Sequence, residues 1–263
     1  MWGSLKGSRD YRGGAVLASV VLGSACGLPA EVESGGDDAD EGAVVLLAAA
    51  EKDLLWRVTN GPAEALAAAK AWDNTELHCP GRLETYETME LIGGCTTDGG
   101  VRLSGKVRVE EAPDGGSWVF EEWVERRVDE TTRWSGNLSW VQTDGANNLT
   151  AYDFVAEWWP AERRAARGTY PYAAFLLDDQ GRALSATGAV TLHFEGAGDP
   201  IALDLAGAWA YDGCDANPTS GGATWTAAES ESGDAVTASF DGLECGACVP
   251  WVGSGGEAGE WCE

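Results

Sequence analysis

Basic residues and histidines are scarce in this 263-residue chain: 17 Lys and Arg stand against 43 Asp and Glu, and there are two His. The net charge of −26 argues against DNA and RNA as partners, because a nucleic-acid-binding domain needs positive charge to hold phosphates. Two histidines are too few for most zinc hydrolases and other His-dependent enzymes. We therefore expect no metal site and treat His78 and His193 as ordinary surface or turn residues.

The chain also lacks the short motifs of common catalytic sites, namely G-x-S-x-G, the P-loop, G-x-G-x-x-G after a strand and H-E-x-x-H. We therefore expect a protein that is not an enzyme and needs no cofactor. A remote alternative is a glycosidase, which uses two carboxylates beside a sugar. Four Glu in Trp-rich segments are candidates for such a pair: Glu121, Glu122, Glu125 and Glu157. In a chain this acidic, such neighbours also arise by chance.

Long apolar runs are absent as well. The longest, AVLASVVLGSA at residues 15–25, would make a helix of about 16 Å, roughly half of a bilayer core. Lys6, Arg9 and Arg12 precede it, and a basic segment followed by a short apolar run is typical of an export signal. We predict that residues 1–25 are a signal peptide.

The residue after this run, Cys26, follows Ser24 and Ala25, and this context resembles a bacterial lipobox, although Gly23 stands where that motif most often has Leu. The resemblance implies cleavage before Cys26, a lipid anchor on this cysteine, and a place at the outer membrane or cell surface. The alternative is ordinary cleavage that leaves an unmodified cysteine. Residues 26–41 are acidic and contain Gly but almost nothing to bury, so they predict a flexible tether.

Residues 42–72 form a helical segment. Helix formers dominate 43–59, Asn60-Gly61 is a reasonable stop, and Pro62 can begin a second short helix that ends near Trp72. The sequence therefore predicts one or two helices, packed with residues 73–263 as one domain.

From residue 81 onward, apolar and polar residues alternate with a period of two, as in an antiparallel sheet with one buried face. Turn signals such as Asp98-Gly99-Gly100 separate the runs. The prediction is a mainly β domain, an antiparallel meander of about ten strands. We expect these strands at 83–92, 101–109, 117–128, 133–140, 149–158, 169–177, 184–194, 201–211, 222–228 and 235–241.

A glycine recurs in the middle of four of these strands, at Gly105, Gly136, Gly188 and Gly207. Glycine weakens a strand, so its repetition points to a geometric need. We interpret it as the sign of a strongly curved sheet or barrel, with the helical segment in its concavity or across one mouth. The alternative is that the glycines leave room for an apolar ligand, as in calyx-like barrels.

Six cysteines follow Cys26, and an even number in an exported chain predicts structural disulfides: Cys79, Cys95, Cys214, Cys245, Cys248 and Cys262. Cys79 and Cys95 stand apart and are expected to pair, while the other four pair among themselves and hold the C-terminal tail. The CGAC at 245–248 is similar to the CxxC of thioredoxin-like enzymes in those four residues alone, which leaves a redox site as a minor alternative.

Several short motifs together resemble the uncharacterised exported lipoproteins of myxobacteria. These motifs are GSAC at 23–26, Cys79-Pro80, GGCTTDGG at 93–100 and GCDANPTSG at 213–221. The resemblance implies no activity. We therefore expect a lipid-anchored cell-envelope protein with a non-catalytic structural or surface-binding role. As a binding protein, it would hold an apolar molecule in the glycine-lined concavity, or a glycan on an aromatic platform formed by Trp118, Trp123, Trp158 and Trp159.

Overall fold

The structure is a computed structural model. It describes residues 49–73, 78–86, 88–112, 114–143, 146–161, 164–196, 199–214, 217–228 and 234–261. The expected signal peptide 1–25, the lipidation site Cys26, the tether 26–41 and Cys262 lie outside these residues.

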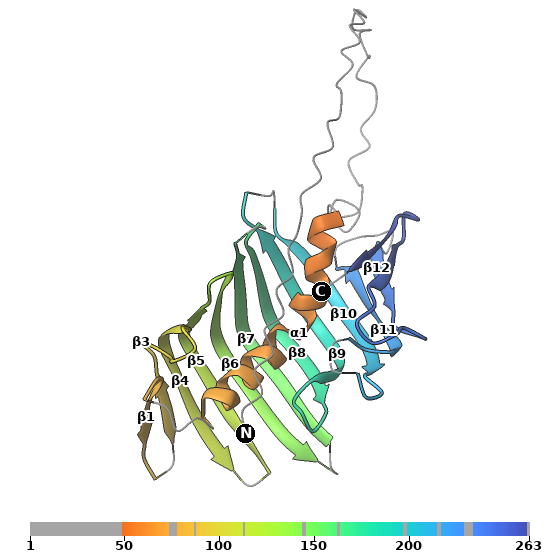
Figure 1. The fold of residues 1–263 in the computed structure, drawn as a ribbon. Helices are drawn as coiled ribbons and strands as arrows, with labels where there is room; N and C mark the ends of the chain where they lie inside the picture. The colour runs from red at the N-terminus through yellow and green to blue at the C-terminus, as the bar shows by residue number, and fades with distance from the viewer. Residues whose placement is uncertain are drawn as a thin grey trace, which may run out of the picture. The chain divides into compact units, whose positions relative to one another are not determined.

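One antiparallel sheet forms the body of the described chain (Figure 1). Each strand pairs with its neighbour in sequence, in the order β1-β2-β4-β5-β6-β7-β8-β9-β10-β11-β12-β13-β14, and β3 pairs with β4 at the side of this path. The strands are β1 (Gly81–Glu84), β2 (Met89–Ile92), β3 (Cys95–Thr96), β4 (Arg102–Ala112), β5 (Gly115–Arg126), β6 (Glu130–Thr143), β7 (Ala146–Pro160), β8 (Ala166–Leu177), β9 (Ala183–Phe194), β10 (Ile201–Ala210), β11 (Ser220–Ala227), β12 (Ala235–Ser239), β13 (Val249–Gly253) and β14 (Ala258–Trp261).

The antiparallel meander is confirmed, but two details of the prediction are wrong. The described residues contain 14 strands rather than about ten. A turn in which the Thr85 hydroxyl accepts a hydrogen bond from the Thr88 amide (3.1 Å) divides the expected strand 83–92 into β1 and β2, and the C-terminal tail adds β13 and β14. The sheet is also open, neither closed nor strongly curled: β1 and β14 lie at the two ends of the strand order and do not pair with each other. Closure is not needed to bury the apolar face, since a helix covers it.

The one helix among the described residues, α1 (Ala49–Asp73), lies across one face of the sheet and bends between its two halves (Figure 1). Asn60-Gly61 does not end it, and Pro62 lies inside it. A proline has no N–H, so Pro62 cannot donate to the carbonyl of Val58 four residues earlier. The buried hydroxyl of Tyr170 in β8 donates to that carbonyl instead. The hydrogen bond that proline removes is thus replaced from the sheet, and the helix continues.

The same bend is fixed by a second buried polar contact and by a close approach. The Thr59 hydroxyl donates to the Leu55 carbonyl (2.8 Å) and accepts a hydrogen bond from Nε1 of Trp225 in β11 (2.8 Å). At Gly61 an added Cβ would lie 2.8 Å from the Tyr170 hydroxyl oxygen and 3.0 Å from the Trp158 ring. Glycine therefore lets the helix backbone approach these rings.

Two ionic or charge-assisted contacts hold α1 to the hairpin between β5 and β6. Arg57 pairs with Glu130, with Nη1 2.5 Å from Oε1, and Trp72 donates its indole N–H to the buried Glu125 at 2.5 Å. The apolar side of the helix packs on the core between these contacts. That core contains the fully buried side chains of Leu55, Trp118, Trp123, Trp158, Trp225, Tyr170 and Phe154.

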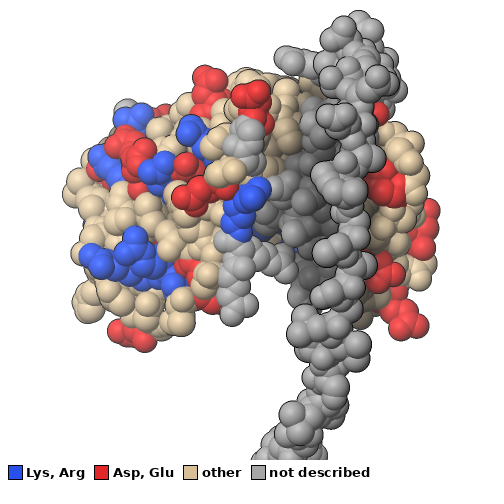
Figure 2. Space-filling view, turned by 90° about the horizontal axis from the view of Figure 1, so that it is seen from above, with Lys and Arg blue, Asp and Glu red and all other residues tan. Residues whose placement is uncertain are grey.

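Charge is unevenly distributed over the sheet. Arg182 is the last Lys or Arg in the chain, so β9 to β14 carry acidic residues without any basic ones. Figure 2 shows Lys and Arg gathered among acids on one side of the view, with acids alone on the opposite side. The part of the sheet that follows Arg182 therefore carries negative charge, mostly in its turns, with no Lys or Arg to balance it.

Candidate functional site

The four tryptophans expected to form a glycan platform do not lie together on the surface. Trp118, Trp123 and Trp158 are fully buried beneath α1, whereas Trp159 is 38% exposed. Successive strand residues point to opposite faces, so Trp159 lies on the outer face of the sheet, away from the helix. The four-residue platform is therefore a wrong prediction, and Trp159 is its one accessible member.

The mid-strand glycines leave no room for a ligand. A Cβ on Gly105 would lie 2.0 Å from the carbonyl oxygen of Glu122, and one on Gly136 would lie 2.3 Å from that of Asp153. Both glycines have positive φ, as do Glu122 and Asp153, and the strand register shifts at both places. The glycines thus accommodate β-bulges in the neighbouring strand. The alternative of a glycine-lined ligand cavity finds no space at either position.

The four candidate glutamates are divided between the two faces. Glu125 is buried on the helix side, where it accepts from Trp72 and Trp123 and pairs with Arg127 at 3.3 Å. Glu122 and Glu157 both pair with Arg133 on the outer face. Glu121 is exposed beside Glu122. Glu122, Glu125 and Glu157 each form an ion pair with an arginine. These ion pairs give each of the three carboxylates a structural role.

The described cysteines form disulfides near the two ends of the sheet. Disulfides join Cys79 to Cys95 and Cys214 to Cys245, and Cys248 is also disulfide-bonded. The first pair is the one expected from the sequence. Because Cys245 and Cys248 are both disulfide-bonded, the CGAC segment contains structural disulfides and no free dithiol in this structure.

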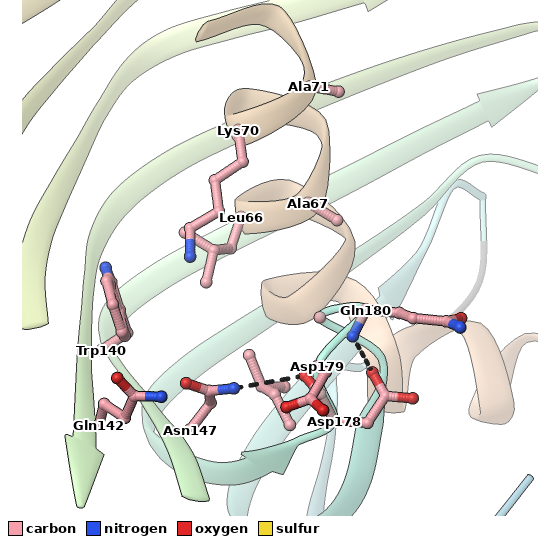
Figure 3. A pocket seen from close by; sticks show the side chains of 12 residues that line it. Leu66, Ala67, Lys70, Ala71, Trp140, Gln142, Asn147, Asp178, Asp179 and Gln180 are labelled. Atoms are coloured by element: carbon pink, nitrogen blue, oxygen red, sulfur yellow. Dashed lines mark hydrogen bonds between the residues drawn. The ribbon is translucent and has the colours of Figure 1, made fainter. Parts of the chain in front are cut away.

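A pocket lies beside the C-terminal half of α1 (Figure 3). It has a volume of about 430 Å³. We call it the helix-side groove. It lies between the helix, the turn ends of β6 and β7, and the turn that joins β8 to β9. Its lining residues are Leu66, Ala67, Lys70, Ala71, Trp140, Gln142, Asn147, Leu177, Asp178, Asp179, Gln180 and Gly181.

One wall of the groove carries a cation on an aromatic ring. The Lys70 side chain runs from the helix toward Trp140, and its Nζ lies 4.2 Å from the ring centroid (Figure 3). Burial lowers the pKa of Lys70 because it disfavours the charged form, while the charge of Glu111 acts in the opposite direction. The ring face attracts the ammonium group. This wall therefore offers a positive charge together with an apolar surface.

The opposite wall is a rigid turn. The Asp178 carboxylate accepts from the backbone N–H of Gln180 (2.9 Å) and Arg182 (2.8 Å), and from Nε of Arg182 (2.8 Å). Arg182 also donates to the Cys214 carbonyl (2.8 Å) and lies 4.1 Å from the Tyr211 ring centroid. These contacts fix the turn, so Gln180 and Gly181 form a firm rim for the groove.

The groove continues past this rim along the helix. A second pocket of about 240 Å³ shares Ala67, Gln180 and Gly181 with the first and extends to Trp56 and Asn60. Ala67 is exposed at the junction of the two. The combined space is an elongated groove with small alanine side chains along the helix and amide groups at the strand ends. Its charged lining residues are Lys70, Glu64, Asp178, Asp179 and Arg182.

This site could not be found from the sequence, because no local motif marks it. Lys70 and Ala67 belong to the predicted helical segment, and Asp178 to Gly181 are an ordinary turn sequence between two predicted strands. Only the tertiary fold brings these segments together. Exposed alanines on a helix opposite a Gly-containing turn are the one weak signal available.

Comparison with protein-family models, with curated proteins and with solved structures finds no match. Within the described part of the chain, no helix combines the length and apolarity that crossing a membrane requires. Among the same residues, no group of three or more His, Cys, Asp and Glu is arranged to hold a metal ion.

Proposed function

We propose that this protein is a lipid-anchored component of the cell envelope that binds a small amphiphilic ligand in the helix-side groove and has no catalytic activity. The observation that carries the binding proposal is the groove itself. A mostly apolar concave site with a few polar groups is the usual form of a small-molecule site. The envelope location rests on the export signal and on the lipobox-like context of Cys26.

The lining selects the chemistry of the ligand. Leu66, Leu177 and the ring of Trp140 offer apolar contact, while Gln142 and Asn147 offer amide donors and acceptors. Lys70 adds a positive charge on the same wall. These groups suit a molecule with an aromatic or aliphatic body and an acidic head.

The direct test fills the groove without deleting any contact. Ala67→Trp places a large ring where the two pockets join, so we expect the Kd for the anionic probe anilinonaphthalene sulfonate to rise about tenfold or more. Binding of the neutral probe N-phenylnaphthylamine should weaken similarly. Fluorescence titration of the full chain measures both.

Two further variants distinguish groove binding from a general effect. Thr187→Trp adds the same ring on the exposed outer face of β9 and should leave both dissociation constants unchanged. Lys70→Met should weaken the anionic probe and spare the neutral one. Equal binding of both probes by the parent, Ala67→Trp and Thr187→Trp would show that the groove is not the site.

A further inference from the structure

The outer face of the sheet carries another hollow, on the face opposite to the helix-side groove and at the other end of β7 and β8. Its volume is about 250 Å³, and its walls include Glu157 and Trp159 of β7, Arg167 of β8, His193 of β9 and the flanking Glu195. The hollow exists because small side chains lie beside a large one. Ala166 is the register partner of Trp158, so Ala165 lies next to Trp159. The small side chain of Ala165 leaves the Trp159 ring uncovered on the side that faces β8.

Polar side chains on one wall of this hollow are aligned by strand register. Arg133 is opposite Glu157, Glu157 is opposite Arg167, and Arg167 is opposite His193. The row therefore crosses four neighbouring strands on one face, and each side chain is directed by rigid backbone rather than by a loop. This placement favours ligand binding, because the side chains lose little conformational entropy when a ligand binds.

Ion pairs orient the planar groups in this row. Glu157 has 10% of its side chain exposed, and it pairs with Arg133 and with Nε of Arg167 at 3.9 Å. The Arg133 guanidinium lies 5.6 Å from the Trp159 ring centroid, so it supports the ring from the β6 side. Arg167 is half exposed and has further N–H donors for a ligand.

The charges around the hollow select against ions. Two guanidinium groups, from Arg133 and Arg167, lie among the three carboxylates of Glu122, Glu157 and Glu195. A simple anion or cation would therefore meet repulsion as well as attraction. A neutral molecule with several hydroxyl groups can instead donate to the carboxylates and accept from Arg167. An exposed indole ring adds an apolar surface for the flat side of such a molecule.

We propose that this hollow binds a pyranose unit of a glycan, with the sugar ring stacked on Trp159 and its hydroxyls hydrogen-bonded to Glu157, Arg167 and Glu195. The site is independent of the helix-side groove, since the two share no residue. One exposed ring and one short row of polar groups suit a single sugar unit, so weak binding per site is expected. Attachment of many copies to a membrane would strengthen it by multivalency.

The test is titration of the full chain with cellohexaose and with chitohexaose, followed by indole N–H chemical shifts in NMR spectra. The Trp159 resonance, identified by its loss in Trp159→Phe, should shift with a saturable dependence on at least one of these sugars. Trp159→Ala should raise the Kd about tenfold or more, and Arg167→Ala should raise it severalfold.

Tyr172→Ala is the matched control, because Tyr172 is also an exposed aromatic residue of the outer face, 47% exposed, and is not in the hollow. It should bind sugar like the parent chain. Ala67→Trp should bind sugar normally too, which separates this proposal from the groove. A second arm uses vesicles with and without lipopolysaccharide, so that a lipid-linked glycan is distinguished from a free one.

Binding in either arm that depends on Trp159 supports the proposal. The absence of any Trp159 shift with both oligosaccharides and with lipopolysaccharide vesicles would overturn it. Equal weakening by Tyr172→Ala and Trp159→Ala would also overturn it. So would selective binding of heparin that is abolished by salt, because that result would assign the hollow to anions.

Discussion

Gly105→Ala should destabilise the protein by about 3 kcal/mol or more. Two effects add at this position. The backbone has φ of 84°, which an alanine adopts only at an energetic penalty, and the new Cβ would lie 2.0 Å from the carbonyl oxygen of Glu122. The atom it meets is backbone within a sheet, so it cannot rotate away. Urea unfolding followed by circular dichroism measures the change.

Gly100→Ala separates the two effects. Gly100 has nearly the same φ, 80°, but no atom lies within 4 Å of the position of an added Cβ. Only the conformational penalty applies, so this variant should lose about 1 kcal/mol. If both variants lost the same stability, the close approach between β4 and β5 would not be the reason for glycine at residue 105.

Tyr170→Phe is the second large prediction, with a loss of about 1–3 kcal/mol. The substitution keeps the ring but leaves the buried Val58 carbonyl without its donor, because Pro62 has no N–H to replace it. The decisive measurement is a double-mutant cycle with Pro62→Ala. Alanine at residue 62 restores an N–H that can donate to Val58, so in that background Tyr170→Phe should lose less than about 1 kcal/mol.

An equal loss in both backgrounds would mean that the Tyr170 hydroxyl does not substitute for the missing helix bond. Pro62→Ala itself should fold, since alanine is the best helix former. Folding of the Tyr170→Phe single variant is checked by its near-ultraviolet circular dichroism. That measurement separates a local loss from a general disruption of the aromatic core.

A pH dependence follows from the same tyrosine. Burial, and then the charge of Glu64, raise the pKa of Tyr170 well above its ordinary value of 10.0. The folded protein therefore keeps this proton when the unfolded chain begins to release it. The stabilisation is fully present below pH 10 and falls above it, by about 1.4 kcal/mol per pH unit. The stability difference between parent and Tyr170→Phe should shrink accordingly, and a constant difference up to pH 11 (about one unit above the ordinary pKa) would contradict this.

The strands could be predicted from sequence because one face of the sheet is buried, and burial imposes a period of two on residues such as Leu184 to Phe194. The same alternation explains the failure at Trp158 and Trp159. Adjacent strand residues point to opposite faces, so these two could not share a platform. The tail strands were missed because β13 and β14 are short and contain Pro250 and Gly259.

The continuous helix could not be predicted, because Asn60-Gly61-Pro62 is a sound local signal for a stop. What overrides it is a hydroxyl 112 residues away in sequence. The open form of the sheet has a similar origin. The helix α1 completes the core of the sheet. Local sequence patterns do not indicate whether a sheet closes into a barrel or stays open with a helix covering its apolar face. The helix-side groove depends on both of these tertiary outcomes.

The order of strands and the position of α1 have a consequence for how the chain folds in time. Every strand pairs with its sequence neighbour, so hairpins can form one after another without long loop closures. The helix precedes every described strand, yet Tyr170 lies 112 residues after its partner Val58, and Trp225 lies 166 residues after its partner Thr59. We therefore expect α1 to dock last, with its apolar side uncovered until β11 has formed. Pulsed hydrogen exchange during refolding should show protection in β5 to β8 before α1, and earlier protection of the helix would contradict this order. If the chain is exported as we propose, it would emerge N-terminus first and expose this uncovered helix to chaperones on the receiving side of the membrane.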